Sequence, residues 1–352
     1  MNLHYPAGGK LPSFNRDTLL EFTEILCALL KAGLTLQDAL ELCGSVSSRT
    51  ADLSRGLRRE LLRGVPFHEA LKQYPSFPPL YQSLVRLGER TGSAAAALFR
   101  MGRYLRAEKK IRGKLMNALW YPLFILVSAL AGCLGILFYV MPRMTELFSA
   151  FNPGGGMPVE IGGIYTSIKI SLSLLLTAAA AVPGFMLLRR KNRTFALAAD
   201  RAALRLPLIG SLAGSIQTLH LSFAVEMLTS AGITLGSALK ESASTAGNLA
   251  FRAAILEVHE ELLRGGKLSR AFSANPIFPK YIGTWIGVGE RTGSVEPVFT
   301  QIREYFQQRV DHGSERLAAL IEPVLTLAAG LIVLFLIVQF VLPLFSLYGR
   351  AL

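Results

Sequence analysis

The hexapeptide GERTGS stands twice in this chain, at residues 88–93 and at residues 289–294. The sequence before it repeats at the same spacing: LLRGVPFHEAL at 61–71 aligns with LLRGGKLSRAF at 262–272, again 201 residues further on. A register kept over so long a stretch is typical of a duplicated structural unit and not of a chance hexapeptide. The chain is therefore predicted to contain two copies of one fold.

Within each copy the pattern of apolar residues is helical. In the first copy, Thr18 and Glu21 have the spacing of a capping box before an apolar helical face. Gly33 is a helix stop, and Thr35 with Asp38 is a start for the next helix. No alternating strand pattern is present, so each copy is predicted to be a bundle of about six helices.

Three long apolar segments lie outside these helical patterns, at 119–141, 166–188 and 320–345. A helix of about 22 residues reaches roughly 33 Å, enough to cross the hydrocarbon core of a bilayer. The first and third follow the two copies, whereas the second lies outside the repeat. It is the return helix that brings the second copy back to the side of the first.

The distribution of charge predicts which side that is. The net charge is +13 although 51% of the residues are hydrophobic. Residues 1–118 contain 18 Lys and Arg against 10 acids, and residues 189–318 contain 16 against 11, while the loop 142–165 has Arg143 alone. By the positive-inside rule both large segments are cytoplasmic and the loop is external. The basic excess therefore needs no nucleic-acid partner.

The predicted fold class is an all-α membrane protein with two repeated cytoplasmic helical bundles and three transmembrane helices. The N-terminus is predicted to be cytoplasmic and the C-terminus external, in a multi-pass protein of the inner membrane. The predicted segments are an N-terminal tail (1–16), the first cytoplasmic repeat (17–118), a first span (119–141), an external loop (142–165), a second span (166–188), the second cytoplasmic repeat (189–318), a third span (319–346) and an external tail (347–352).

Motifs for catalysis or metal binding are missing from the sequence. No GxxxxGK[ST] loop for nucleotide phosphates and no GxSxG nucleophile elbow occurs. The His-Glu pairs at 68–69 and 259–260 resemble the start of HExxH, but Lys72 and Leu263 replace the second histidine, so both pairs are interpreted as solvated helix-face residues. The chain is predicted to be no enzyme and to hold no cofactor or metal. Its three cysteines lack CxxC spacing and are interpreted as buried thiols: Cys27, Cys43 and Cys133.

The repeated hexapeptide has two interpretations. As a structural turn, its glycines permit left-handed or closely packed backbone, its serine caps the following helix, and its Glu and Arg pair locally. As an interaction site, the turn contacts a moving partner. The candidate residues are Gly88, Glu89, Arg90, Thr91, Gly92, Gly289, Glu290, Arg291, Thr292 and Gly293.

Three further candidates belong to the predicted spans. Pro122 and Pro323 lie near the start of the first and third spans. Glu322 is an acid within an apolar segment, which is costly in a membrane and often functional. It is either a polar contact between helices or with a partner, or a residue close enough to the interface to cost little.

Taken together, the two GERTGS-bearing helical units, each leading to a span with an early proline, resemble the GspF/PilC family. The first copy shows the membrane-entry pattern KLMNALWYP at 114–122 and VMP at 140–142, and the second keeps Pro323 and Pro343 but has Glu322 in place of the tyrosine. The resemblance covers residues 17–346. Many members carry a further small region before the first unit, for which this chain has only about sixteen residues.

The resemblance implies an inner-membrane platform protein of a type II secretion system or a type IV pilus. Its implied partners are a cytoplasmic hexameric assembly ATPase, pilins or pseudopilins, other inner-membrane components, the lipid bilayer and further copies of the chain. One alternative is a small transporter or channel subunit, for which Glu322 is the available polar group. Another is a membrane peptidase, which would require paired aspartates beside a span.

Overall fold

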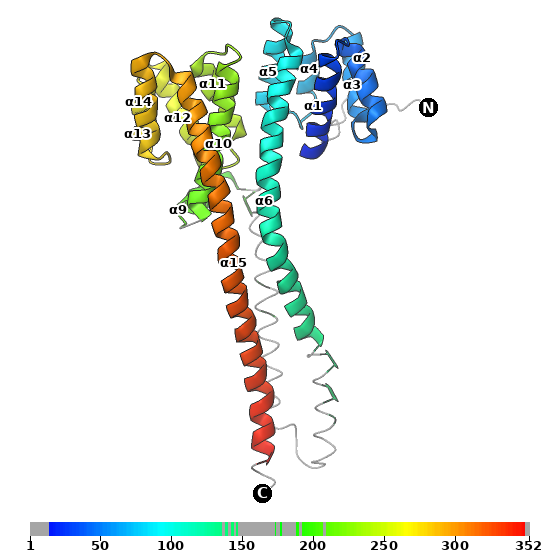
Figure 1. Ribbon diagram of the computed structural model, residues 1–352, viewed down its shortest axis with the longest axis vertical. Helices are drawn as coiled ribbons and strands as arrows, with labels where there is room; N and C mark the ends of the chain where they lie inside the picture. Colours follow the sequence, from blue (N-terminus) through cyan, green and yellow to red (C-terminus); the bar gives the residue numbers. More distant parts are fainter. Residues whose placement is uncertain are drawn as a thin grey trace. The chain divides into compact units, whose positions relative to one another are not determined.

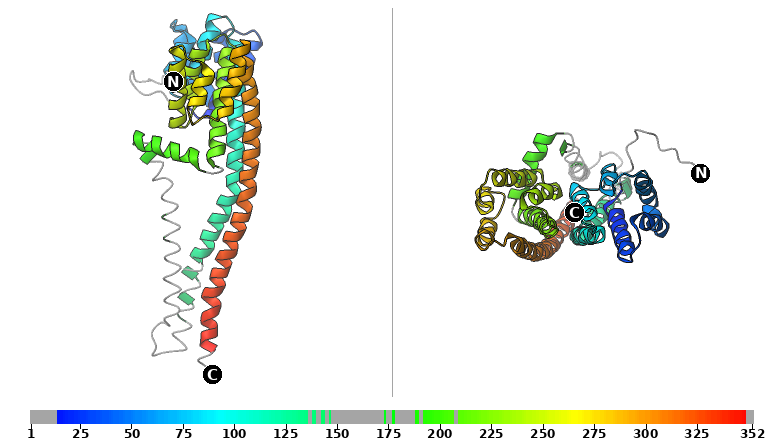
Figure 2. Two further views of the ribbon diagram at one scale, coloured as in Figure 1. Left: turned by 90° about the vertical axis from the view of Figure 1, so that its left-hand side faces the viewer. Right: turned by 90° about the horizontal axis from the view of Figure 1, so that it is seen from above.

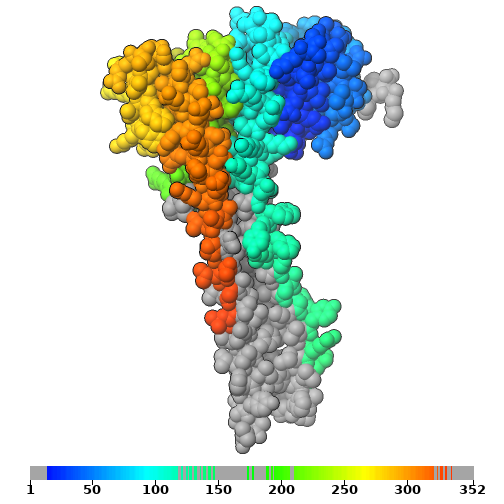
Figure 3. Space-filling model, in the orientation of Figure 1, coloured from blue at the N-terminus to red at the C-terminus, as the bar shows by residue number. Residues whose placement is uncertain are grey.

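The computed structural model describes residues 14–135, 192–206 and 209–348, with the separate residues 138–139, 142–143, 146, 173, 177 and 188–189 (Figure 1). Side chains are described for fewer residues, which are the coloured ones in Figure 3. Within these residues the chain forms helices and no strand. The all-helical prediction is confirmed for this part of the chain. The predicted second span (166–188) and most of the external loop lie outside the described residues.

The first helical group, residues 16–113, consists of five short helices and the start of a long one (Figure 1). Gly33, with a φ of +87°, ends the first helix, and the Thr35 hydroxyl caps the second by accepting the Asp38 N–H at 3.2 Å. This boundary is the predicted one. The helices are α1 (Arg16–Lys31), α2 (Leu36–Val46), α3 (Ser48–Leu62), α4 (Phe67–Lys72), α5 (Pro79–Arg90) and α6 (Ala94–Gly135).

The predicted capping box at Thr18 and Glu21 is wrong. Helix α1 begins earlier, after Asn15, and the Glu21 carboxylate instead accepts the Ser47 hydroxyl at 2.7 Å. A partner 26 residues away in the sequence therefore takes the place of the local one.

The second helical group, residues 209–311, likewise has five helices and the start of a long one, with an additional 3-10 helix, and is preceded by the separate helix α9 (Figure 1). Left-handed glycines end corresponding helices in the two groups: Gly64 and Gly265 have φ of +82° and +84°, and Gly92 and Gly293 have φ of +68° and +69°. The elements are α9 (Arg193–Arg205), α10 (Ile209–Thr229), α11 (Leu235–Ser242), the short 3-10 helix η2 (Ala243–Thr245), α12 (Leu249–Leu263), α13 (Leu268–Ala274), α14 (Lys280–Thr292) and α15 (Val295–Tyr348).

Aromatic and leucine side chains form the core of the first group. Tyr81 is fully buried, and its hydroxyl lies 3.0 Å from that of the buried Thr23, which satisfies both polar groups. Phe22 and Phe77 make an edge-to-face contact at 6.0 Å between ring centroids. Two cysteines are buried in this core, as predicted, and burial raises the pKa of the Cys43 thiol. The side chain of the third, Cys133, lies outside the described residues.

By its contacts the chain divides into two compact units, residues 1–113 with 200–311, and residues 114–199 with 312–352. Both helical groups therefore belong to one unit, although each is drawn as its own cluster of short helices (Figure 2). The core of the first group continues into the second through Ala224, Met227 and Leu228 of α10. Burial of these side chains joins the two groups by the hydrophobic effect.

Helices α6 and α15 run on beyond that unit and cover most of two predicted spans, 119–141 and 320–345. In the described part of the chain no individual helix combines the length and hydropathy of a membrane span; Thr194–Arg205 and Gly210–Thr229, bent by 108° where they meet, do so only as a pair. The three spans and the segment boundaries stay predictions.

Candidate functional site

The repeated hexapeptide forms the turn between the fifth helix of each group and the long helix that follows. In the first copy the Ser93 N–H donates to the Gly88 carbonyl at 2.7 Å, and the Thr91 N–H donates to that of Leu87 at 3.0 Å. Gly92 lies between them with a left-handed φ of +68°. This is the Schellman type of helix ending, in which glycine at the left-handed position allows the last carbonyls to find partners.

The first glycine of the motif, Gly88, allows helices α5 and α6 to pack closely. A Cβ atom built on Gly88 would lie 2.8 Å from the Cβ of Ala97 and 3.0 Å from the Cα of Ala94. Both neighbours belong to the first turn of α6. A larger residue at position 88 would therefore force α5 and α6 apart, and the predicted close packing of the glycine is what the structure contains.

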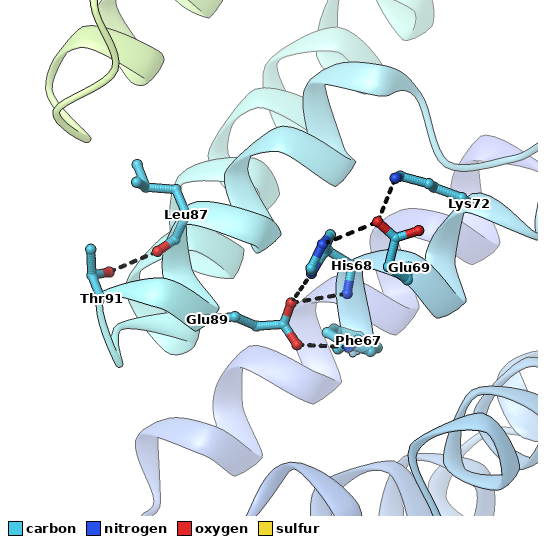
Figure 4. A network of polar contacts seen from close by, with 7 residues as sticks. All are labelled: Phe67, His68, Glu69, Lys72, Leu87, Glu89 and Thr91. Carbon is cyan, nitrogen blue, oxygen red and sulfur yellow. Dashed lines mark hydrogen bonds and ion pairs between the residues drawn. The ribbon is translucent and has the colours of Figure 1, made fainter. Parts of the chain in front are cut away.

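Glu89 fixes the turn to a third helix, α4 (Figure 4). Its carboxylate accepts the Phe67 N–H at 2.7 Å and the His68 N–H at 3.0 Å, and its second oxygen lies 2.5 Å from the His68 Nδ1. Helix α4 has Pro66 at its N-cap position, which has no side-chain group to cap it. The carboxylate of Glu89 supplies the missing acceptor, and its negative charge suits the positive end of the helix.

The second copy repeats this arrangement. The Glu290 carboxylate accepts the Leu268 N–H at 2.6 Å and the Ser269 hydroxyl, at the start of α13. The Ser294 N–H donates to the Gly289 carbonyl at 2.9 Å. A Cβ on Gly289 would lie 2.7 Å from a methyl group of Val298. In both copies, then, one carboxylate links the turn to a short helix that begins 22 residues before it in the sequence.

The expected pairing of Glu with the neighbouring Arg is not what the turn contains. Both carboxylates are directed at helix N-termini, while Arg90 and Arg291 are exposed on the surface. Arg291 donates from Nε to the Gly287 carbonyl at 3.3 Å, a bond within its own helix. In the described part of the chain, the Arg90 guanidinium forms no ion pair.

The two threonines of the motif bond backward along their helices. Thr91 Oγ1 donates to the Leu87 carbonyl at 2.9 Å and lies 2.6 Å from the Ser93 hydroxyl. Thr292 Oγ1 lies 3.1 Å from the Val288 carbonyl. The two threonine hydroxyls are thus occupied within their own helices and turns, whereas the side chains of Arg90 and Arg291 are exposed.

The structure describes only some of the remaining residues that the sequence singled out. The side chains of Pro122 and Glu322 lie outside the described residues. Pro323 is exposed, within α15. The interpretation of His68 as a solvated residue is wrong, because its ring is only 18% exposed and contacts Glu89. His259 is half-buried, and its Nδ1 is enclosed with no hydrogen-bond partner among the described residues.

Sequence analysis missed a contact between the two helical groups. The ring of Tyr104 on α6 lies against His220 and Phe223 of α10, at centroid distances of 6.0 Å and 5.5 Å. Burial lowers the pKa of His220 to about 4, with Arg16 acting in the same direction, and burial raises the pKa of Tyr104 to about 12. The Nε2 of His220 is buried with no hydrogen-bond partner in the described part of the chain. Neither group belongs to a motif that a sequence pattern would single out.

Comparison with known proteins places this arrangement in a family. The family model for protein F of the type II secretion system matches residues 22–142 and 224–343, two segments that together make up more than half of the chain. Each segment contains one copy of the turn. The chain belongs to the type II secretion system protein F family. The predicted resemblance is thereby confirmed.

Curated relatives of this family align along nearly the whole chain. The type IV pilus assembly protein PilC of Thermus thermophilus is 28% identical over 97% of this chain and 86% of its own length. The type 4 fimbrial assembly protein PilC of Pseudomonas putida is 28% identical, over 93% and 82%. The type II secretion system protein F of Xanthomonas campestris is 27% identical, over 95% and 84%.

Proposed function

We propose that this member of the protein F family is the inner-membrane platform of a type II secretion or type IV pilus-type machine, and that it couples a cytoplasmic assembly ATPase to the assembly of pilin or pseudopilin subunits. The observation that carries the proposal is the match of the family model to both halves of the chain. The names of the relatives support it, since they are pilus assembly proteins and a secretion-system component.

The residues of the chain agree with a mechanical role and not with a catalytic one. The sequence has no phosphate-binding loop, so the energy of ATP must come from another protein. Among the described residues no group of three or more His, Cys, Asp or Glu side chains is placed to hold a metal ion. Family members are platform components of these machines, and we assign this chain no reaction of its own.

The proposed arrangement in the membrane follows the distribution of charge. Both helical groups face the cytoplasm, spans at 119–141, 166–188 and 320–345 cross the inner membrane, and the C-terminus is external. Two long helices, α6 and α15, support this arrangement because each begins in a helical group and continues into a predicted span. A displacement at the cytoplasmic end of such a helix is carried along its axis, since the backbone hydrogen bonds of a helix resist bending.

Within this proposal the repeated turns have a mixed function. Their glycines, threonines and glutamates hold the fifth helix, the short helix and the long helix together. Arg90 and Arg291 have exposed side chains in the last turns of α5 and α14, four residues before α6 and α15 begin. They are the groups through which an acidic surface of the ATPase or another machine component would act on the long helices.

Site-specific crosslinking in cells tests the proposal. A photoreactive residue at position 90 or 291 is expected to crosslink to the assembly ATPase or a neighbouring machine component, and one within 320–345 to a pilin or pseudopilin. Tags at positions 40 and 260 should both be accessible from the cytoplasm. Crosslinks to neither partner would contradict the proposed coupling, and tags in different compartments would contradict the topology.

A further inference from the structure

The second helical group contains a cavity of about 520 Å³ that lies wholly within residues 201–309. Its walls come from α9, α10, α12, α14 with the segment before it, and α15, all of which are labelled in Figure 1. The volume is in the range of sites that bind small molecules. None of the residues singled out from the sequence lines it, so the turn and the cavity are separate features.

Three arginines with exposed side chains are among the residues that line the cavity. Arg201 and Arg205 lie one turn apart on α9 and so share a face of that helix, and Arg309 comes from α15. In the described part of the chain none of these guanidinium groups forms an ion pair. The acid in the lining is Glu257, whose carboxylate accepts the side-chain N–H of Asn275 at 2.7 Å. The lining therefore contains three positively charged side chains and one negatively charged side chain.

Hydrogen bonds hold one of the cations in place. Arg309 Nη1 donates to the Tyr281 hydroxyl at 3.0 Å, and Nη2 lies 3.4 Å from the Ser211 hydroxyl at the start of α10. A guanidinium group held by neutral hydroxyls keeps its full positive charge. The lining also contains apolar side chains, among them Ala253 and Ile277. The cavity therefore offers cations for an anion and apolar side chains for a carbon skeleton.

The first helical group has a buried aromatic ring at the position that corresponds to Asn275. At the shift of 201 residues that relates the two GERTGS copies, Asn275 corresponds to Tyr74 and Glu257 to Gly56. Tyr74 is only 4% exposed, and its ring lies 6.1 Å from that of Phe14. A Cβ atom on Gly56 would collide with the Tyr74 hydroxyl. The first copy thus has a large buried ring where the second has a short amide, and a glycine where the second has the carboxylate of Glu257.

From this lining we propose that the cavity of the second group binds a phosphate-bearing ligand, with the phosphate on Arg201, Arg205 and Arg309 and the adjoining carbon atoms against the apolar side chains. Arginine is suited to this because its planar fork donates two hydrogen bonds to one phosphate. Such a phosphate belongs either to the headgroup of an anionic phospholipid or to a soluble organophosphate, and both sources present the same chemistry to the site.

Binding to the full-length chain in detergent micelles distinguishes the two sources. Inorganic phosphate, titrated by calorimetry, represents the soluble ligand. Phosphatidic acid against phosphatidylcholine, counted as bound lipid by native mass spectrometry, represents the headgroup. Arg201→Gln with Arg205→Gln should weaken binding by about tenfold or more, because two charge-assisted contacts are lost. Arg252→Gln removes an exposed positive charge on α12 outside the cavity and should leave binding unchanged.

A filled cavity gives a second and independent test. Glu257→Gly with Asn275→Tyr reproduces the residues of the first copy and should abolish binding while all three arginines remain. Retained helical circular dichroism shows that this variant is folded. Binding of phosphate and of phosphatidic acid supports the site for either source, and binding of phosphatidic acid alone assigns it to lipid. Binding of neither probe, or an equal loss in Arg252→Gln, would overturn the proposal.

Discussion

Removal of the Glu89 carboxylate should loosen helix α4 while the rest of the first helical group stays folded. In Glu89→Ala the N–H groups of Phe67 and His68 lose acceptors at 2.7 Å and 3.0 Å, and His68 Nδ1 loses its contact at 2.5 Å. A hydrogen bond to a charged group contributes about 1.5–3 kcal/mol, and loss of an N-cap costs about 1 kcal/mol. Because these contributions overlap, the expected cost of the substitution is about 2–4 kcal/mol.

Hydrogen–deuterium exchange with mass spectrometry measures this cost where it occurs. A loss of about 2–4 kcal/mol in the local opening free energy corresponds to an increase of about 30- to 1000-fold in the exchange of α4 amides. The second copy supplies a matched control: Glu290→Ala should expose α13 and leave α4 protected, because the Glu290 carboxylate accepts the Leu268 N–H and the Ser269 hydroxyl.

A further control comes from the same turn. Arg90→Ala removes an exposed side chain and should change the protection of α4 by less than about 0.5 kcal/mol. The reasoning is refuted if Glu89→Ala leaves α4 protected to within that limit, or if α13 and α4 respond equally to it. Either result would mean that the carboxylate does not cap the helix.

Three other predictions follow from the turn and from the contact between the helical groups. Gly92→Val or Gly293→Val forces a branched residue into a left-handed conformation and should destabilise the turn by about 1–3 kcal/mol, so that fibre assembly in cells stalls while membrane fractionation still recovers the protein. A variant that is degraded would show that the turn is needed for folding alone. Arg90→Glu with Arg291→Glu should abolish co-purification of the ATPase at unchanged melting temperature; normal co-purification would exclude these arginines as contacts. Because burial lowers the pKa of His220 to about 4 from an ordinary 6.5, the folded protein loses up to about 3 kcal/mol as the pH falls from 6.5 towards 4 and none above 6.5. Thermal unfolding at several pH values should show this loss in the wild type but not in His220→Leu, and parallel curves would contradict it.

Sequence signals correctly predicted those features that depend on contacts between neighbouring residues. The boundary between α1 and α2 follows from Gly33 and Thr35, because a left-handed glycine and a hydroxyl cap act within a few residues of themselves. The helical class and the two glycine positions of each turn were predictable for the same reason. The repeat added a check, since a pattern that occurs twice at one spacing is less ambiguous than either copy alone.

Distant partners were not predictable in this way. Glu21 was assigned to a capping box and instead accepts the Ser47 hydroxyl, and Glu89 was assigned to its neighbour Arg90 and instead caps α4. In both cases the sequence offered a partner within four residues, and tertiary packing brought a better one. A carboxylate that can accept several backbone N–H groups at a helix end gains more there than from one solvated guanidinium group.

Comparison of the two copies distinguishes residues that stabilise the turn in both from residues that differ between the two halves. Glu89 and Glu290 are identical and make equivalent contacts, so their identity follows from the fold. Tyr74 and Asn275 occupy corresponding positions, but Tyr74 is buried beside Phe14 whereas Asn275 lines the basic cavity of the second group. Because the turn is shared, it cannot distinguish the two halves. The difference at these positions is what supports a phosphate site proposed for the second group alone.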